Sequence, residues 1–289
     1  MQFSGRSCLV SLLLLGGCAQ PTAERVDGPS LSFILSDVEG DRLLRFDAQT
    51  GARIDTDASW GTFEGPAGTC VSDDGDSLFV TSFATGALAR FDAPGGPLSE
   101  ELFLDRVLLE EPVGVMPYDG DLLVLGNDTR NVVRLAPDGA VVDTFGDYAL
   151  KEPHDFAVGP DGLLYIGTAG YNAAMGTVQV FDPDTGERVR DFAPVDEVAD
   201  AVGLAFDGDT LLVSDWFGER LLRYDPVTGE QLEVVADGLS GPLDLLVLDD
   251  GVLLMDRDDV LRIDEDSVET LVYGADHGLE WPRGLTLAE

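Results

Sequence analysis

Lysine, cysteine and histidine are scarce in this 289-residue sequence. Lys151 is the only lysine, and the chain has 17 basic residues against 55 acidic ones, three cysteines and two histidines. The net charge of −38 excludes nucleic acid and anionic lipid headgroups as partners, because a surface of this sign repels phosphate. So few cysteines and histidines argue against haem and iron–sulfur cofactors, which depend on such ligands.

Several sequence signatures of catalysis are also missing. There is no G-x-S-x-G stretch for a serine nucleophile, no C-x-x-C pair and no Walker sequence. No apolar run after residue 17 is long enough to cross a bilayer as a helix. Function must therefore be sought in the arrangement of residues around the fold.

The N-terminal region has the pattern of a secretion signal. Arg6 precedes an apolar run, residues 8–15, which is too short to span a membrane. Leu15-Gly16-Gly17-Cys18 follows and resembles the bacterial lipobox. That resemblance implies removal of residues 1–17, lipidation of Cys18 and anchoring in a lipid bilayer outside the cytoplasm of a bacterium. The alternative is an ordinary signal peptide with a chance cysteine.

The residues after Cys18 refine this prediction. Ala19 in place of aspartate favours, by the same resemblance, the outer membrane or cell surface over the inner membrane. Residues 18–30 are polar, contain two prolines and lack periodicity, so we expect a flexible tether. Cys70 then remains as the only other cysteine of the processed chain, and it lies within an apolar strand pattern, which indicates a buried side chain.

A cassette of about 40–50 residues recurs through residues 31–289. In the copy from Val202 to Glu230, short apolar runs alternate with a D-G turn and a D-P-x-T-G turn, a pattern typical of β-strands. Six copies of each strand type can be counted. The chain begins with a second strand and ends with a first strand, residues 283–289. Such repeats predict an all-β, six-bladed β-propeller of four-stranded blades, closed by the C-terminal strand.

The first strand of most copies begins with proline, one variable residue and glycine or aspartate. The fourth copy has Ala201-Val202-Gly203, and the others read Pro66-Ala67-Gly68, Pro112-Val113-Gly114, Pro153-His154-Asp155, Pro242-Leu243-Asp244 and Pro282-Arg283-Gly284. Together with the R-x-x-x-[FY]-D third strands, this pattern resembles NHL-type six-bladed propellers over nearly all of residues 31–289. The resemblance implies an architecture and leaves function open.

The variable and glycine positions of these first strands are expected to face the central channel. Most carry small or apolar residues, but His154, Asp155, Asp244 and Arg283 do not. Equivalent positions of different blades meet around the axis, so we predict that these four residues form a ligand site or a charge-paired plug. His277 lies in the last loop before Arg283, and we expect it on the same face.

Aromatic residues are expected to gather on that face. They are Trp60, Phe63, Tyr171, Trp216, Phe217 and Trp281, with the carboxylates Glu64, Asp215 and Glu280 among them. An aromatic rim with acidic groups suits a sugar, a peptide or a small cation. The alternative is that these rings pack between blades.

Three families of propeller enzymes provide more specific comparisons. The segment PHDFAVGPDGLLYIGT, residues 153–168, resembles strands of peptidyl-hydroxyglycine amidating lyases and virginiamycin B lyases. The former hold a metal with histidines from several blades, and here only His154 matches. Glu64-Gly65-Pro66 resembles the E-G-P motif of senescence-marker/gluconolactonase propellers, which are calcium-dependent. Other ligand positions of that family are missing or shifted, and calcium needs six or more oxygens.

These observations predict a lipid-anchored protein that binds a small ligand or a protein partner through its channel face. The ligand-binding residues are then His154, Asp155, Asp244, Arg283, Trp216, Trp281 and Glu64. One alternative is a calcium- or zinc-dependent hydrolase or lyase that uses Glu64, His154, Asp155 and Asp244, with His154 and Asp155 on the metal. Another is a scaffold subunit of a cell-envelope complex.

Overall fold

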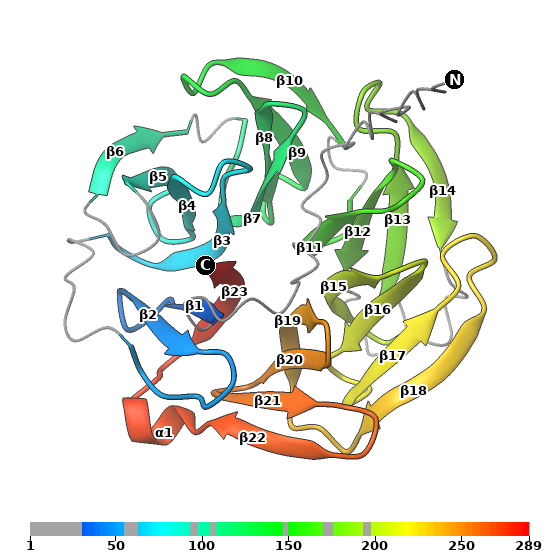
Figure 1. Cartoon of the computed structure of the whole chain (residues 1–289). Coiled ribbons are helices and arrows are strands. Elements are labelled where there is room, and N and C mark those ends of the chain that lie inside the picture. Colours follow the sequence, from blue (N-terminus) through cyan, green and yellow to red (C-terminus); the bar gives the residue numbers. More distant parts are fainter. Residues whose placement is uncertain are drawn as a thin grey trace, which may run out of the picture.

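The structure, a computed structural model, describes residues 31–54, 63–92, 98–104, 108–146, 150–169, 176–192 and 198–288. The strands of these residues form six antiparallel sheets around a central axis (Figure 1). The chain is therefore a six-bladed β-propeller, as the repeats predict. The described residues contain no helix long and apolar enough to cross a membrane.

In five blades the strands run outward from the axis in sequence order, and in the closing blade the last strand, β23, is innermost, followed by β1 and β2. The innermost strands are β3 (Pro66–Val71), β7 (Pro112–Tyr118), β11 (Pro153–Val158), β15 (Ala201–Asp207), β19 (Pro242–Leu248) and β23 (Pro282–Ala288). The second strands are β1 (Ser32–Asp37), β4 (Ser77–Ser82), β8 (Asp121–Gly126), β12 (Leu164–Thr168), β16 (Thr210–Asp215) and β20 (Gly251–Asp256). The third strands are β2 (Arg42–Asp47), β5 (Ala87–Asp92), β9 (Asn131–Leu135), β13 (Thr177–Phe181), β17 (Arg220–Tyr224) and β21 (Asp259–Ile263).

Five blades have a fourth, outer strand within the described residues. These strands are β6 (Leu98–Phe103), β10 (Val141–Phe145), β14 (Arg188–Phe192), β18 (Gln231–Asp237) and β22 (Val268–Val272). In the remaining blade an isolated bridge joins Phe46 to Arg53 beside β2, and the chain that follows, residues 55–62, is not described. A short helix, α1 (Gly274–His277), connects β22 to β23.

The ring closes through a single sheet that combines distant parts of the sequence. β23 pairs antiparallel with β1, so that Leu35 lies opposite Leu285 and Ser32 opposite Ala288. The Ser32 hydroxyl also donates a hydrogen bond of 2.6 Å to the carbonyl of Ala288. This is the closure that the order of strand types predicts, and it leaves no unpaired innermost strand.

Tight turns fix the register of the strands. Between β7 and β8, Asp119 (φ +49°) and Gly120 (φ +80°) form a two-residue loop, with Tyr118 opposite Asp121. Two successive positive φ values are typical of a type I′ hairpin, which matches the twist of the flanking strands. The Asp119-Gly120 dipeptide therefore sets where β7 ends.

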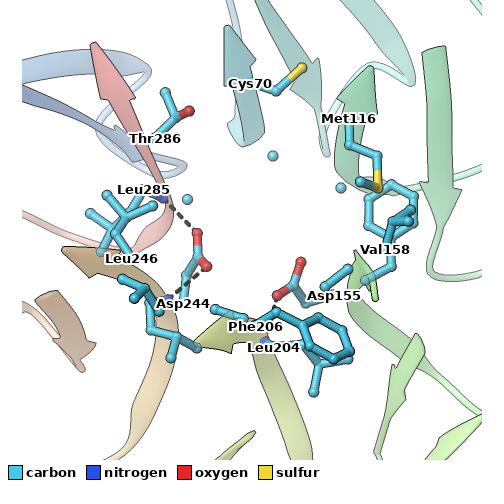
Figure 2. Close-up of a pocket in the computed structure, with 18 of the residues that line it drawn as sticks. Cys70, Met116, Asp155, Val158, Leu204, Phe206, Asp244, Leu246, Leu285 and Thr286 are labelled. Atoms are coloured by element: carbon cyan, nitrogen blue, oxygen red, sulfur yellow. Dashed lines mark hydrogen bonds between the residues drawn. The ribbon is translucent and has the colours of Figure 1, made fainter. Parts of the chain in front are cut away.

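The six innermost strands surround a cavity on the axis of the ring (Figure 2). A β-bulge or other register irregularity interrupts the start of each of them, as between Pro153 and Asp155 of β11 and between Pro242 and Leu245 of β19. In a regular strand successive side chains point to opposite faces. The irregularity explains how consecutive residues, such as His154 and Asp155, can both line the cavity.

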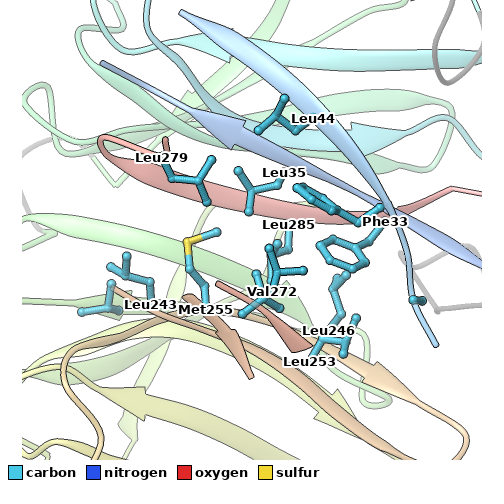
Figure 3. Close-up of a cluster of buried hydrophobic side chains, with 14 residues drawn as sticks. Phe33, Leu35, Leu44, Leu243, Leu246, Leu253, Met255, Val272, Leu279 and Leu285 are labelled. Carbon is cyan, nitrogen blue, oxygen red and sulfur yellow. The ribbon is translucent and has the colours of Figure 1, made fainter. Parts of the chain in front are cut away.

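The hydrophobic core lies between the blades. Figure 3 shows the cluster between the blade of β1 and the blade of β20, where Phe33 and Leu35 face Leu253 and Met255. All four side chains are fully buried, and burial of such a side chain contributes roughly 1.5–3 kcal/mol. Packed interfaces of this kind hold the innermost strands, and the side chains that they carry, in fixed positions.

Candidate functional site

The axial cavity has a volume of about 810 Å³, within the range of small-molecule sites. Its wall is mostly apolar and includes Met116, Phe206, Leu246 and Leu285 (Figure 2). We call the residues just after the start of each innermost strand the mouth ring; they are Ala67, Val113, His154, Val202, Leu243 and Arg283. The next residues form the second ring: Gly68, Gly114, Asp155, Gly203, Asp244 and Gly284.

Two carboxylates of the second ring project into this cavity. Asp155 comes from β11 and Asp244 from β19, with the strand β15 between them (Figure 2). An Oδ2 atom of Asp155 accepts a hydrogen bond of 2.7 Å from the backbone N–H of Leu204. Asp244 accepts hydrogen bonds from the backbone N–H groups of Leu245, at 2.7 Å, and Leu285, at 2.6 Å. Both carboxylates are therefore held in place by backbone donors.

These hydrogen bonds also join neighbouring blades. Where the second ring has glycine, a hydroxyl of the second strand can make the connection instead. Ser214 accepts a hydrogen bond from the N–H of Gly203 and donates one to the carbonyl of Leu243 on the next blade. Ser36 makes the equivalent pair with Gly284 and Ala67. The carboxylates of Asp155 and Asp244 thus make the hydrogen bonds between blades that an uncharged hydroxyl group makes elsewhere in the ring.

The environment of the two carboxylates opposes their ionisation. Burial, and then the negative charge of Asp244, raises the pKa of Asp155 well above its ordinary value. Burial raises the pKa of Asp244 to about 6, although the N–H groups of Leu285 and Leu245 and the charge of Arg283 act in the opposite direction. Within the described residues, neither carboxylate has a basic partner at ion-pair distance, so a cation bound between them would favour their ionised forms.

The mouth ring contributes one cation and one imidazole. β11 and β23 are the third and sixth innermost strands, so His154 and Arg283 lie across the channel from each other. Burial, and then the positive charge of Arg283, lowers the pKa of His154 to about 3, so that its imidazole is neutral near pH 7. Its Nδ1 atom is buried and finds no hydrogen-bond partner among the residues that the structure describes.

Arg283 is positioned by an aromatic ring. Its guanidinium lies 5.1 Å from the centroid of Trp281, which in turn contacts Phe83 edge-on at 5.7 Å. The charges of Asp200 and Asp244 act favourably on this guanidinium, but no ion pair within 4 Å joins Arg283 to any described residue. Stacking on Trp281 therefore holds the guanidinium while leaving its N–H donors available.

Asp200 is a further acidic residue near the mouth that the sequence does not reveal. It is 6% exposed, and its Oδ1 atom has no hydrogen-bond partner among the described residues. Burial, followed by the charges of Asp215 and Glu152, raises the pKa of Asp200 to about 7. Asp200 directly precedes Ala201, and the innermost strands of the other blades begin with proline at the position of Ala201. This difference is the only signal in the sequence that sets Asp200 apart.

The structure brings four of the predicted site residues together and separates others from them. His154, Asp155, Asp244 and Arg283 all line the cavity. Trp281 lies beside this group because the guanidinium of Arg283 stacks on its ring. Trp216 is partly buried and packs against the hydrophobic cluster of Figure 3, and Glu64 is exposed and does not line the cavity.

Two other expectations about the channel face, those for Phe63 and Asp215, are wrong, and a third residue, His277, does not reach the cavity. Phe63 is buried and packs edge-on against Phe91 in a core cluster. Asp215 is fully buried; it accepts backbone hydrogen bonds and forms an ion pair with Arg220 at 3.2 Å. His277 lies on α1 against Phe46 and does not line the cavity. In each case local packing or hydrogen bonding directs the side chain away from the channel.

Two of the predicted rim aromatics, Trp60 and Tyr171, fall outside the described residues, as do Cys18 and the tether at residues 18–30. Phe217 is 56% exposed.

The residues present do not fit the calcium or zinc site that the resemblances imply. Among the described residues, no three His, Cys, Asp or Glu side chains come close enough to hold a metal ion. Zinc needs about three protein ligands, and calcium six or more oxygens. The carboxylates of Asp155 and Asp244 also accept backbone hydrogen bonds, which occupy part of their capacity for a metal.

Comparisons with known proteins support the architecture. No protein-family model matches the sequence, and no curated protein matches it either. Among solved structures, a chain of a nidogen/laminin complex superposes with a TM-score of 0.72 at 17% identity, covering 90% of this chain and 99% of the other. A protein of unknown function from Bacteroides caccae gives 0.68 at 10% identity, covering 90% and 100%. At such identities the likeness is one of fold, and the chain is a six-bladed β-propeller of the same shape as these proteins.

Proposed function

We propose that this protein binds a small organic cation in its axial cavity, with Asp155 and Asp244 as the groups that receive the positive charge. The observation that carries the proposal is the pair of carboxylates that project into one apolar cavity without a basic partner at ion-pair distance in the described structure. An isolated buried carboxylate is unfavourable unless it is protonated or paired. A ligand ammonium or guanidinium would provide that pairing.

The cavity also defines the rest of the ligand. Beyond the second ring the wall is formed by residues such as Met116, Phe206 and Leu246. These side chains favour an apolar body, and an aromatic wall such as Phe206 suits a cation or a ring. The backbone hydrogen bonds from Leu204 and Leu285 hold the carboxylates before a ligand arrives, which lowers the entropy lost on binding.

Isothermal titration calorimetry of the full chain tests this proposal, with 2-phenylethylamine as the cationic probe and 2-phenylethanol as its neutral analogue. We expect the amine to bind at least roughly tenfold more tightly than the alcohol, and Asp155→Asn and Asp244→Asn each to remove that preference. Asp209→Asn, in the exposed turn between β15 and β16, is the matched control and should bind as the wild type does. Equal binding of amine and alcohol, or an unchanged preference in both cavity variants, would contradict the proposal.

We also propose that the protein is a bacterial lipoprotein held at the cell envelope through Cys18. The support is the Leu15-Gly16-Gly17-Cys18 sequence after a short apolar run, followed by a polar tether. Metabolic labelling with a radioactive fatty acid tests it: label should enter the wild type and be lost in Cys18→Ser. Label retained in the variant, or absent from the wild type, would contradict the lipid anchor.

A further inference from the structure

The mouth ring offers a second kind of contact, directly above the carboxylate pair. Four of its six positions carry Ala67, Val113, Val202 and Leu243, which have no polar side-chain atom. The other two, His154 and Arg283, lie on opposite innermost strands and both line the cavity. All the side-chain hydrogen-bonding capacity of the mouth ring is therefore concentrated in this one pair.

Of these two residues, Arg283 has hydrogen-bonding groups that a ligand in the cavity can reach. The buried Nδ1 of His154 has no partner among the described residues. Arg283 has five N–H donors, yet its recorded contact in the described structure is stacking on Trp281, at 5.1 Å. A buried charged donor without an acceptor is unfavourable, and a guanidinium is well matched to a carboxylate or another oxyanion.

The mouth ring and the second ring are one residue apart along the strands. The charges of Arg283 and Asp244 act on each other, so an anion at Arg283 and a cation between Asp155 and Asp244 would be near neighbours in the cavity. Charged groups that close together on one small molecule are joined by two or three bonds, as in an amino acid. Beyond the carboxylates the wall continues with apolar side chains such as Met116 and Phe206.

From this layering we propose that the ligand is an amphiphilic zwitterion, an amino acid with a large apolar side chain or substituent. Its carboxylate contacts Arg283, its ammonium lies between Asp155 and Asp244, and its apolar part extends toward Met116 and Phe206. The inference rests on the proposed cation site and adds the anionic group and its position. A cavity of about 810 Å³ leaves room for a substituent larger than a natural side chain.

Calorimetry of the full chain with three matched probes tests the inference. These are L-phenylalanine, 2-phenylethylamine, which lacks the carboxylate, and 3-phenylpropionate, which lacks the ammonium. We expect phenylalanine to bind roughly tenfold more tightly than the amine and the propionate to bind most weakly. This series needs no variant, so it stays informative even if a substitution at the mouth ring impairs folding.

Variants assign the preference to named groups. Arg283→Met should abolish the advantage of phenylalanine over the amine while binding of the amine persists, and Arg283→Lys should retain part of it. Asp155→Asn should weaken both ligands. Thermal unfolding of each variant establishes that it is folded.

The outcomes separate the two proposals. If the amine binds and phenylalanine binds no more tightly, or if Arg283→Met keeps the full preference, the zwitterion inference is wrong and the cation site stands. If neither amine nor phenylalanine binds to the wild type, both proposals fail, because the second depends on the first.

Discussion

The carboxylate of Asp155 accepts a 2.7 Å hydrogen bond from the backbone N–H of Leu204 on the next blade. Asp244 does the same with Leu285 at 2.6 Å. Two acidic side chains thus connect blades at positions where Ser214 and Ser36 connect others through a hydroxyl group. The two aspartates both join blades and bring charge to the channel, whereas the two serines only join blades. Substitutions at the serines therefore measure how much such a hydrogen bond contributes to stability in the absence of charge.

Ser214→Ala should lower the free energy of unfolding by about 1–3 kcal/mol. The substitution leaves the N–H of Gly203 and the carbonyl of Leu243 without the partner that they have in the wild type. Ser267→Ala, in an exposed turn, is the control and should stay within about 0.5 kcal/mol of wild type. Urea unfolding measures both. A Ser214→Ala variant as stable as the control would show that the hydroxyl does not hold the blades together.

Gly203→Ala should destabilise the fold by about 3 kcal/mol or more. A Cβ atom at this position would overlap the carbonyl oxygen of Leu243 on the neighbouring innermost strand, and backbone atoms cannot move aside as a flexible side chain can. Gly162→Ala is the comparison: it has a positive φ of 77° but open space around it, so only the backbone conformation opposes the change, by about 1 kcal/mol. Similar losses in the two variants would refute close packing of the innermost strands.

Asp215→Ala should lower the free energy of unfolding by about 3 kcal/mol. Its buried carboxylate accepts backbone hydrogen bonds from Ala199, Asp200 and Gly218 and pairs with Arg220. Asp225 also accepts two backbone hydrogen bonds, but its carboxylate lies at the surface, so Asp225→Ala should be far milder. If Asp215→Ala unfolds as the wild type does and instead abolishes ligand binding, the expectation that Asp215 lies among the carboxylates of the channel face would be restored.

The stability of the fold should depend on pH because burial disfavours the ionised form of Asp244. Its pKa rises from 3.8 to about 6 on folding, so the folded state holds the proton more tightly than the unfolded state does. The stabilisation from that proton is complete below pH 3.8 and is lost as the pH rises through 6. Relative to Asp244→Asn, the wild type should therefore lose about 2–3 kcal/mol between pH 4 and pH 6.5.

Urea unfolding at a series of pH values measures this difference, in the ligand-free protein. Asp209→Asn, whose side chain is exposed, should parallel the wild type. If the difference in stability between wild type and Asp244→Asn stays constant over the whole range, folding does not shift the pKa of Asp244. If the wild type gains stability relative to the variant as the pH rises, folding lowers this pKa instead of raising it.

The architecture could be predicted from the sequence because its information is local and repeated. Each D-G or D-P-x-T-G turn ends a strand through residues that tolerate the turn conformation, and six repetitions compensate for the ambiguity of any one. The same register places His154, Asp155, Asp244 and Arg283 at equivalent positions of different blades, so their convergence on one cavity also follows from the repeat.

The remainder of the site depends on contacts that no repeat encodes. Phe63 and Asp215 occupy loop and strand-end positions whose side-chain direction is decided by Phe91 in one case and by backbone donors in the other. Asp200 becomes buried only because the blades of β11 and β15 meet there. The irregularities that bring consecutive residues to the cavity wall are likewise features of strand pairing, which a single-sequence pattern does not contain.

The pairing of β1 with β23 has a consequence for the order of folding. Ser32 and Ala288 are 256 residues apart in the sequence, so β1 stays without its inner neighbour until nearly the whole propeller has been synthesised. Loop closure over such a distance is entropically unfavourable until the intervening blades have formed and shortened it. Until β23 joins it, the inner edge of β1 therefore presents unpaired backbone groups of the kind that promote association with other strands.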